Sequence, residues 1–508
     1  MADVEATFVA ALEHHLILHV LNNLDSNDLA KLEACSSSFR KPANLDPDHT
    51  LSLPELAART MCEARSLVKQ MPEDRKTELK HRCGGSWKLV LMFLQSGERV
   101  RQHACPDVVA GQGHSVVLSK SGAVYTFGEN NAGQLGHPLQ TELWKPHLLS
   151  LLDGVRVTQA VAGIERTMLV TDTGHVYAFG RDVFGMNEYP SAESKLDDQL
   201  VNVPELVESL HGIAVVQITM GYFFTAVLSQ EGKVYTLSWG FSKRFGHACN
   251  ADREARLLGG ALADIPVVQI AGGHCFLLAL AYEPKGMCVY SLGCGLGGKL
   301  GHGSEKTEGL PCRIAYFDEH TDFKPIAIAA GPWHAVALSE DGRVCTWGWA
   351  YNGCLGYRDD HESYFAHKNL PTVVAELVHR VKVVRISAGY NSTFAFAEDG
   401  EIYCFGETSL VQEAGYKPKL ITNFKDMGEH VIRLSMTHAG VVKKHMLALT
   451  SSGKVYACGA GAGGQLGRQL MTGSRESSQI VDIDFCFNTI TKSRELVGGL
   501  WRELFSMR

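Results

Sequence analysis

The sequence predicts a mainly β protein: a seven-bladed β-propeller of about 55-residue repeats, preceded by a small all-α region. Two observations carry this prediction. A similar segment recurs seven times from about residue 103 onward, and each copy holds two short apolar runs joined by a turn that contains glycine. Seven small sheets that each need neighbours close most naturally into a ring, because a propeller leaves only short, protected edges.

The central hairpin of each copy is the clearest part of the repeat. The first copy reads AGQGHSVVLSKSGAVYTFGENNAGQLG from Ala110 to Gly136, and the fifth reads GPWHAVALSEDGRVCTWGWAYNGCLGY from Gly331 to Tyr357. Runs rich in Val, Tyr and Phe around a turn such as KSG or EDG indicate a β-hairpin, and their nearly continuous apolar character predicts strands covered on both faces. The glycine that ends the second run falls at positions 128, 180, 240, 293, 348, 406 and 459.

These motifs resemble the regulator of chromosome condensation repeat family, whose copies carry a GxxH element, a dG-x-V-Y-x-W/F-G hairpin and an N-x-x-G-Q-L-G turn. Copies one, four, five and seven keep the turn as GQLGH, GKLGH, GCLGY and GQLGR. Copies two, three and six depart from it with GMNEY, FSKRFGH and ETSLVQEAG. The resemblance implies a propeller over residues 103–490, in which IVDIDF, Ile480–Phe485, is a candidate closing strand.

Helical patterns precede the repeats. Apolar residues at Leu12, Leu16, Val20 and Leu24 recur every four positions and predict one helical stripe, and DSND supplies an N-cap for a second helix with Leu29 and Leu32. The pair resembles an F-box through Leu12, Val20, Leu21, Leu24, Asp28, Leu29, Cys35 and Phe39, with Glu13 where that family has proline. The resemblance implies that the six stripe residues bind the adaptor of a cullin-RING ubiquitin ligase. The alternative is that they pack on the chain's own helices.

We expect four parts: F-box-like helices in residues 1–45, a helical region in 46–102, the propeller in 103–490, and a tail in 491–508 that forms a short helix. The segment WKLVLMFLQSG is too apolar for a solvated helix, so the second region should dock on the propeller. Its docking residues are Trp87, Leu89, Val90, Met92, Phe93 and Leu94. Together, the F-box-like segment, this helix and the repeats resemble a group of plant proteins.

The composition argues against several classes of protein. The 48 basic and 55 acidic residues give a formal net charge of -7, so nucleic-acid binding is not expected. The start, MADVEATF, lacks the basic residues of a secretory signal, and no apolar run is long enough to span a membrane. We therefore expect a cytoplasmic or nuclear protein without membrane contact. The 14 cysteines include no C-x-x-C pair, which predicts reduced thiols and no metal.

No catalytic, cofactor-binding or metal site is predicted. His114 and His334 occupy the same place in their copies, which favours imidazoles hydrogen-bonded between strands or blades. GAGAGGQLG at Gly459–Gly467 lacks the lysine and the helix of a phosphate loop and is interpreted as a blade turn. No G-x-S-x-G elbow follows a strand. The cysteines at positions 345, 404 and 458 lie within strands and should pack in the core.

The sequence thus favours a protein-interaction module: an F-box-like subunit of a cullin-RING ubiquitin ligase whose propeller binds the client. The alternatives are a propeller scaffold without a ligase role, guanine-nucleotide exchange on a Ran-like GTPase, and ultraviolet-B sensing. Exchange is disfavoured by the acidic start and the altered loops, and light sensing by the lack of tryptophans at the matching place in several copies. Trp347 replaces a core phenylalanine of other copies, whereas Trp333, Trp349 and Tyr351 are candidate client-binding residues on a propeller face.

Overall fold

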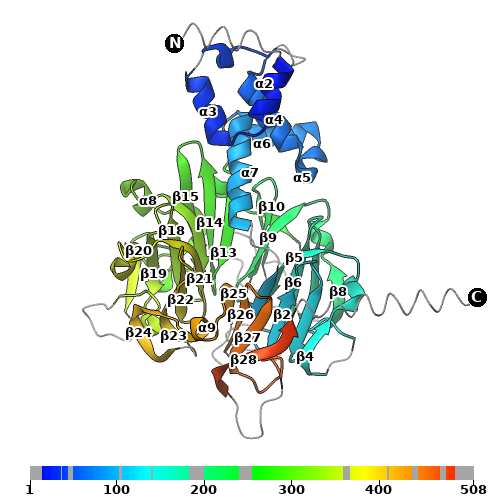
Figure 1. Cartoon of the computed structure of the whole chain (residues 1–508), viewed down its shortest axis with the longest axis vertical. Helices are drawn as coiled ribbons and strands as arrows, with labels where there is room; N and C mark the ends of the chain where they lie inside the picture. Colours follow the sequence, from blue (N-terminus) through cyan, green and yellow to red (C-terminus); the bar gives the residue numbers. More distant parts are fainter. Residues whose placement is uncertain are drawn as a thin grey trace, which may run out of the picture.

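The computed structural model describes residues 14–35, 37–43, 50–101, 106–138, 141–181, 200–222, 224–238, 254–357, 366–408, 411–437, 444–468 and 476–486. From Asp107 onward the strands form seven four-stranded sheets, each with its strands paired in chain order. The sheets are arranged around an axis below a group of helices (Figure 1). The protein is a seven-bladed β-propeller, as the sequence predicts. The expected C-terminal tail lies outside the described residues.

The strands have the following bounds. Blades 1 and 2 consist of β1 (Asp107–Ala110), β2 (His114–Leu118), β3 (Val124–Gly128), β4 (Leu143–Leu148), β5 (Val157–Ala162), β6 (Arg166–Thr171), β7 (Val176–Arg181) and β8 (Leu200–Leu206). Blades 3 and 4 consist of β9 (Val215–Met220), β10 (Phe224–Ser229), β11 (Val234–Ser238), β12 (Arg256–Leu257), β13 (Val267–Gly272), β14 (Phe276–Glu283), β15 (Gly286–Gly293) and β16 (Glu308–Arg313).

Blades 5 to 7 consist of β17 (Pro325–Ala330), β18 (His334–Ser339), β19 (Val344–Trp349), β20 (His367–Val373), β21 (Val383–Ala388), β22 (Ser392–Ala397), β23 (Ile402–Thr408), β24 (Val411–Leu420), β25 (Val431–Met436), β26 (His445–Thr450), β27 (Lys454–Ala460) and β28 (Glu476–Cys486). Two short helices, α8 (Tyr316–Glu319) and α9 (Asn423–Asp426), lie between blades.

The hairpin between the second and third strands follows the predicted pattern. In blade 1 every residue of β2 and β3 is buried, because neighbouring blades cover both faces of the sheet. The turn needs glycine: Gly122 has a φ of +85°, and a Cβ there would lie 2.8 Å from the carbonyl oxygen of Val157 in the next blade. The hairpin tip of one blade therefore fits closely against the next.

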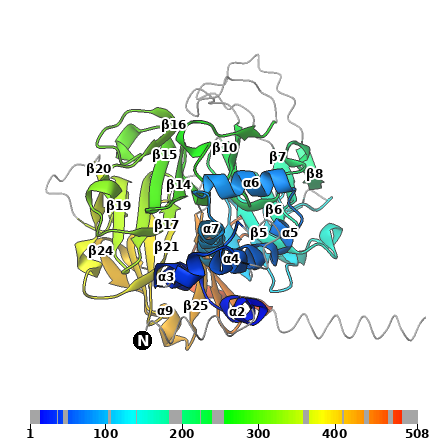
Figure 2. The same ribbon diagram turned by 90° about the horizontal axis from the view of Figure 1, so that it is seen from above.

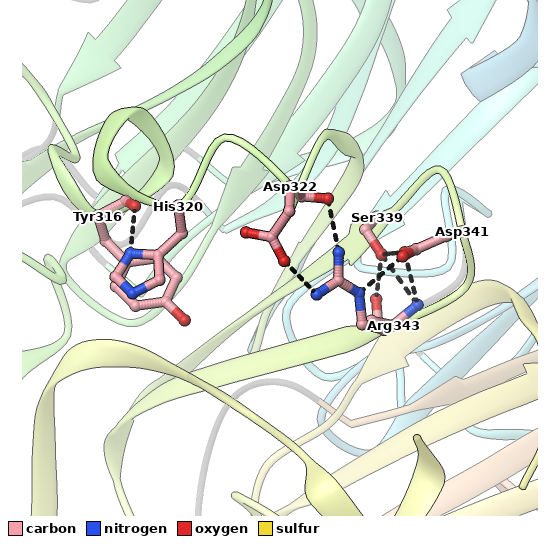
Figure 3. A network of polar contacts seen from close by, with 6 residues as sticks. All are labelled: Tyr316, His320, Asp322, Ser339, Asp341 and Arg343. Carbon is pink, nitrogen blue, oxygen red and sulfur yellow. Dashed lines mark hydrogen bonds and ion pairs between the residues drawn. The ribbon is translucent and has the colours of Figure 1, made fainter. Parts of the chain in front are cut away.

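In blade 5 an arginine ties the hairpin tip to the loop before the first strand (Figure 3). Arg343 donates from Nη1 to Asp322 Oδ2 at 2.8 Å and from Nε to Asp341 Oδ2 at 2.7 Å. Its backbone N–H donates to Ser339 Oγ at 2.9 Å. The hydrogen bond from Arg343 lowers the pKa of Asp322. The network orders the upper rim of this blade.

Buried hydrogen bonds join neighbouring blades at the histidine of the GxxH element. His114 Nε2 lies 2.9 Å from Thr167 Oγ1, and His334 Nε2 lies 2.9 Å from Thr393 Oγ1. The Thr167 hydroxyl donates to the carbonyl oxygen of Gln134 at 2.8 Å, so His114 Nε2 must carry the hydrogen that it shares with Thr167. Burial lowers the pKa of His114 to about 4, which keeps the ring neutral. The predicted structural role of these histidines is confirmed.

Glutamines on the first strands form a second set of links between blades, next to the axis. Gln269 donates from Nε2 to the carbonyl oxygen of Ile328 at 2.9 Å and accepts from the N–H of Ile328 at 2.8 Å. Gln159 and Gln217 make the same paired bonds to the following blade. The glutamines line a central cavity of about 720 Å³.

The ring closes between its first and last blades. The N–H of Ala110 donates to Ser435 Oγ at 3.0 Å, and Arg433 Nε lies 3.8 Å from Asp107 Oδ1. The candidate closing segment Ile480–Phe485 does form a strand within β28, but β28 pairs with β27 as the outermost strand of blade 7. All four strands of blade 7 come from one stretch of chain, so packing of β1 against β25 and β26, and not strand exchange, closes the ring.

Helices occupy the segment before the propeller. They are α2 (His14–Leu21), α3 (Ser26–Cys35), α4 (Leu53–Glu63), α5 (Ser66–Lys69), α6 (Glu73–Arg82) and α7 (Trp87–Arg101). Figure 2 shows α7 near the axis of the ring, above the ends of the first strands. We call the side of the ring that carries the helices the upper face.

The helices share a hydrophobic core with blade 4. Buried Phe93 of α7 packs against Tyr282 of β14, with ring centroids 6.4 Å apart. The β14–β15 hairpin has two eight-residue strands and reaches up beside α7 (Figure 1). Arg82 of α6 donates to the carbonyl oxygens of Glu231 at 2.8 Å and Ile265 at 3.2 Å in and beside blade 3. The helical segment is thus fixed to blades 3 and 4.

Candidate functional site

The lower face of the ring lies at the opposite end of the strands. It is made of the segments that join the first strand to the second and the third to the fourth. In blades 1, 2 and 4 to 7, the residue before the second strand lies opposite the residue after the glycine that ends the VYxFG run. The N–H of Trp349 donates to the carbonyl oxygen of Trp333 at 3.0 Å, and that of Cys294 donates to that of Cys275 at 2.8 Å. We call these opposed residues face pairs.

Face pairs differ in chemistry although their backbone geometry is the same. In blade 2, Arg181 Nη1 lies 3.3 Å from Glu165 Oε2. In blade 6, Asn391 Nδ2 lies 3.3 Å from Glu407 Oε2. Blade 5 has two tryptophans, stacked at 25° with ring centroids 5.6 Å apart. Side chains directly opposite on neighbouring strands interact, so these three blades present different pairs on a common backbone frame.

Five rings form a continuous row across blades 3, 4 and 5. Tyr222 lies 4.4 Å from His274, and His274 stacks on Trp333 at 4.7 Å. Beyond the Trp333–Trp349 pair, Trp349 lies 5.0 Å from Tyr351. All five side chains are half-buried, so each ring is held in place yet reaches solvent. We call Tyr222, His274, Trp333, Trp349 and Tyr351 the aromatic row.

Backbone hydrogen bonds between blades position the row. The N–H of Tyr222 donates to the carbonyl oxygen of His274 at 2.9 Å, and that of His274 donates to that of Pro332 at 3.1 Å. A close approach fixes Trp349: Gly297 has a φ of +72°, and a Cβ there would lie 1.0 Å from Trp349 Nε1. Only glycine therefore suits position 297 while Trp349 keeps this place.

A polar cluster borders the Tyr351 end of the row. Glu407 accepts from Asn352 Nδ2 at 2.7 Å and lies 3.5 Å from Lys444 Nζ. Burial raises the pKa of Glu407, but the hydrogen bonds from Asn391 and Asn352 and the charge of Lys444 outweigh it, so the net pKa is lowered and the carboxylate is ionised. Lys444 Nζ also lies 4.6 Å from the centre of the Tyr390 ring. This end of the row therefore carries fixed charges of both signs.

The structure brings the three candidate propeller residues together, since Trp333, Trp349 and Tyr351 are consecutive members of the row. Trp347 is fully buried, as its place in the repeat predicts, and its Nε1 donates to the carbonyl oxygen of Lys299 at 3.0 Å. Sequence reasoning missed Tyr222 and His274. Both directly follow the glycine that begins a lower-face loop, and that shared place in the repeat was the available signal.

The structure places the helical candidates on different sides of their helices. Val20 is 62% exposed, whereas Ile17 and Leu21 form the buried side of α2. Ile17 and Leu21 lie four residues apart and pack toward α4, which turns Val20 to solvent.

Of the other helical candidates, Leu29 is fully buried and Leu24 and Leu32 are partly buried against the same core. Leu12 and the side chain of Leu16 lie outside the described part of the chain.

Searches of the described residues for other kinds of site give two findings. No group of three or more His, Cys, Asp and Glu side chains gathers in a way that could hold a metal ion there. Within the same residues, no helix is long and apolar enough to cross a membrane.

The parts of the chain that match known repeat models lie within the propeller. The model of the regulator of chromosome condensation (RCC1) repeat matches residues 121–170, 288–338 and 341–396, and a second model of this repeat matches residues 107–134 and 326–354. The ultraviolet-B receptor UVR8 of Arabidopsis thaliana is 27% identical over 60% of this chain and 65% of its own length. The human E3 ubiquitin-protein ligase HERC2 is 31% identical over 57% of this chain and 6% of its own length. The chain thus spans less than two thirds of either relative.

A solved structure agrees with this assignment. The crystal structure of Prp20p from Saccharomyces cerevisiae superimposes with a TM-score of 0.53 at 23% identity, over 65% of this chain and 79% of that chain. A likeness at this level of identity shows the fold. The chain is therefore a seven-bladed propeller in which residues 121–170, 288–338 and 341–396 match the RCC1 repeat.

Proposed function

We propose that the chain is a protein-interaction subunit that binds a client protein through the aromatic row. The observation that carries this proposal is the row itself, five half-buried rings from three blades in continuous contact. Tryptophan and tyrosine are enriched among the residues that dominate binding energy at protein interfaces. The rings are held by neighbouring rings and backbone, so a client would meet a surface that loses little side-chain entropy on binding.

The arrangement of the two faces supports this use of the row. The helices contact the ends of strands on the upper face, and the row lies at the other ends of the same strands. A six-residue strand such as β9 is roughly 20 Å long. A client on the row and a second partner on the helices could therefore be bound at the same time.

We further propose that α2 and α3 bind the adaptor of a cullin-RING ubiquitin ligase. Exposed Val20 and the partly buried Leu24 and Leu32 support this proposal, while Leu29 serves the internal core. HERC2, which shares the repeats, is an E3 ubiquitin-protein ligase, so such propellers occur in ligases. The alternative is a propeller scaffold that binds its client without a ligase role.

Point variants of the full chain test both proposals. Removing residues before about 100 is unsuitable, because α7 shares a core with blade 4 and its loss would expose Tyr282. We expect Val20→Asp to abolish co-purification of the adaptor and to leave the client bound, and Trp349→Ala to do the reverse. If the wild-type chain does not retain the adaptor at micromolar concentration, the scaffold alternative stands.

A further inference from the structure

Lys299 in the lower turn of blade 4 has unusual surroundings for a lysine. Its side chain is fully buried, and its Nζ lies 3.7 Å from Cys275 Sγ and 3.8 Å from Cys294 Sγ. The third neighbour of the ammonium group is the face of Trp333, 5.1 Å from the ring centre. Within the described part of the chain, no carboxylate lies within ion-pair distance of this nitrogen.

The turn itself does not require a lysine. The same place in the first and last copies holds Gln134 and Gln465, whose side-chain oxygens accept from the N–H groups of Ala132 and Gly463 at 2.9 Å. These glutamines close their turns. A lysine ammonium has no acceptor, so Lys299 cannot do this and points between the two sulfurs instead.

Cys275 and Cys294 are the face pair of blade 4. They flank the paired residues Phe276 and Gly293 of β14 and β15, and the N–H of Cys294 donates to the carbonyl oxygen of Cys275 at 2.8 Å. Hydrogen-bonded residues opposite one another have Cα atoms about 5.5 Å apart, which lies within the range that disulfides span. Their exposed fractions are 5% and 7%, whereas Cys345 and Cys458 inside the strands have 0%.

The ammonium group of Lys299 lies close enough to either sulfur to stabilise a thiolate there. A buried ammonium group without a counter-charge is costly, and a thiolate beside it supplies that charge. The contact therefore favours a nucleophilic sulfur, because the thiolate is the reactive form of cysteine and a neighbouring lysine favours it.

We propose that Cys275, Cys294 and Lys299 form a lysine-activated dithiol that a hydroperoxide such as hydrogen peroxide oxidises to a reversible disulfide. One thiolate attacks a peroxide oxygen, so that an S–O bond forms as the O–O bond breaks, and the Lys299 ammonium protonates the leaving hydroxide to water. The second thiol attacks the sulfenic sulfur, the S–S bond forms, and a second water leaves. In total, two thiols and one peroxide give one disulfide and two waters, a two-electron oxidation. This site does not depend on the proposed client binding.

The test uses the full-length chain, reduced and then treated with hydrogen peroxide, blocked with an alkylating agent under denaturing conditions and digested for mass spectrometry. The expected product is one peptide pair linked through Cys275 and Cys294 that thiol reductant separates. Cys345 and Cys458 should stay reduced over the same time, and this comparison within one unaltered chain does not depend on any variant.

Lys299→Gln is the matched control, because it restores the residue that Gln134 and Gln465 provide in the other turns. We expect it to unfold at a similar temperature and to form the disulfide at least about tenfold more slowly, because it lacks the ammonium group that stabilises the thiolate. The proposal is overturned if the linked peptides do not form, if Cys345 and Cys458 are oxidised equally fast, or if a folded Lys299→Gln variant reacts at the wild-type rate.

Discussion

Trp333 and Trp349 stack on one another at the lower end of blade 5, with their ring centroids 5.6 Å apart and their planes at 25°. The two corresponding residues form an ion pair in blade 2, Glu165 with Arg181. The repeat therefore holds a constant backbone frame and varies the side chains that it presents at one position of each blade. Because the backbone stays constant while these side chains vary, the lower face is well suited to bind a partner protein.

The two neighbouring tryptophans of β19 should differ in their contribution to stability. Trp347 is fully buried and donates a hydrogen bond to the carbonyl oxygen of Lys299, whereas Trp349 is half-buried. We expect Trp347→Ala to lower the free energy of unfolding by about 3–5 kcal/mol and Trp349→Ala to lower it by less than half of that. Denaturant unfolding of the two variants measures the difference. Equal losses would mean that Trp349 is a core residue and not part of a binding face.

A glycine in blade 4 should control the position of Trp349. Gly297→Ala places a Cβ where the Trp349 indole now lies, and it also strains a backbone at φ +72°. Gly212→Ala is the matched control, since Gly212 has a φ of +77° and nothing within 4 Å of an added Cβ. We expect both variants to lose about 1 kcal/mol from backbone strain. Only Gly297→Ala should also change the tryptophan fluorescence and weaken client binding, and identical behaviour of the two would contradict the contact.

The buried histidine between blades 1 and 2 should make stability depend on pH. Burial lowers the folded-state pKa of His114 from 6.5 to about 4. Between these two pH values His114 is therefore protonated in the unfolded chain and neutral in the folded chain. Stability from this group is therefore lost as pH falls from 6.5 toward 4. Between pH 7 and pH 5 the loss should be about 2 kcal/mol, from 1.36 kcal/mol per pKa unit.

His114→Gln removes this titration while its amide can still donate to Thr167. The free energy of unfolding of the variant should change less between pH 7 and pH 5 than that of the wild type, by about the same 2 kcal/mol. All other titrating groups are present in both proteins, so their contributions cancel in the difference between the two pH profiles. Parallel pH profiles for the two proteins would show that His114 is protonated within the fold.

The contact between Phe93 of α7 and Tyr282 of β14 should couple the helices to the propeller. The two rings lie 6.4 Å apart, and both side chains are buried. A double-mutant cycle with Phe93→Ala and Tyr282→Ala should give a coupling energy of about 1 kcal/mol. Helices and strands should also unfold together. Separate transitions, or additive effects of the two substitutions, would show an independent helical unit.

Much of the propeller could be predicted from the sequence because the repeat encodes it locally. Within the described residues, the glycine at the hairpin turn and the closing glycine of each copy stand at positions where the structure needs positive φ, as at Gly122 and Gly128. Trp347 stands where other copies have Phe127, Phe179 and Phe405, which predicts a core residue, and all four side chains are fully buried. Such features depend only on one blade and its immediate neighbour.

The aromatic row could be predicted only in part, because it depends on how separate blades meet. Tyr222 and His274 lie in different copies, and their contact exists only once the ring brings the two loops together. The spacing on α2 also does not decide which side of the helix is buried. Residues four apart fit either side of a short helix, and packing on α4, not the spacing, selects Ile17 and Leu21 over Val20. The sequence does not single out Lys299, because this residue stands in a GKLG turn that matches the repeat.

Binding of a purified client to the wild-type chain and to Trp349→Ala tests the central claim most directly. The client is the protein that the wild-type chain retains and the variant loses, and calorimetry then gives the Kd for both. Loss of an aromatic anchor that contributes about 2 kcal/mol should raise the Kd about 30-fold, while Val20→Asp leaves it unchanged. A Kd for Trp349→Ala within a factor of two of the wild-type value would contradict the assignment of the lower face as the binding surface.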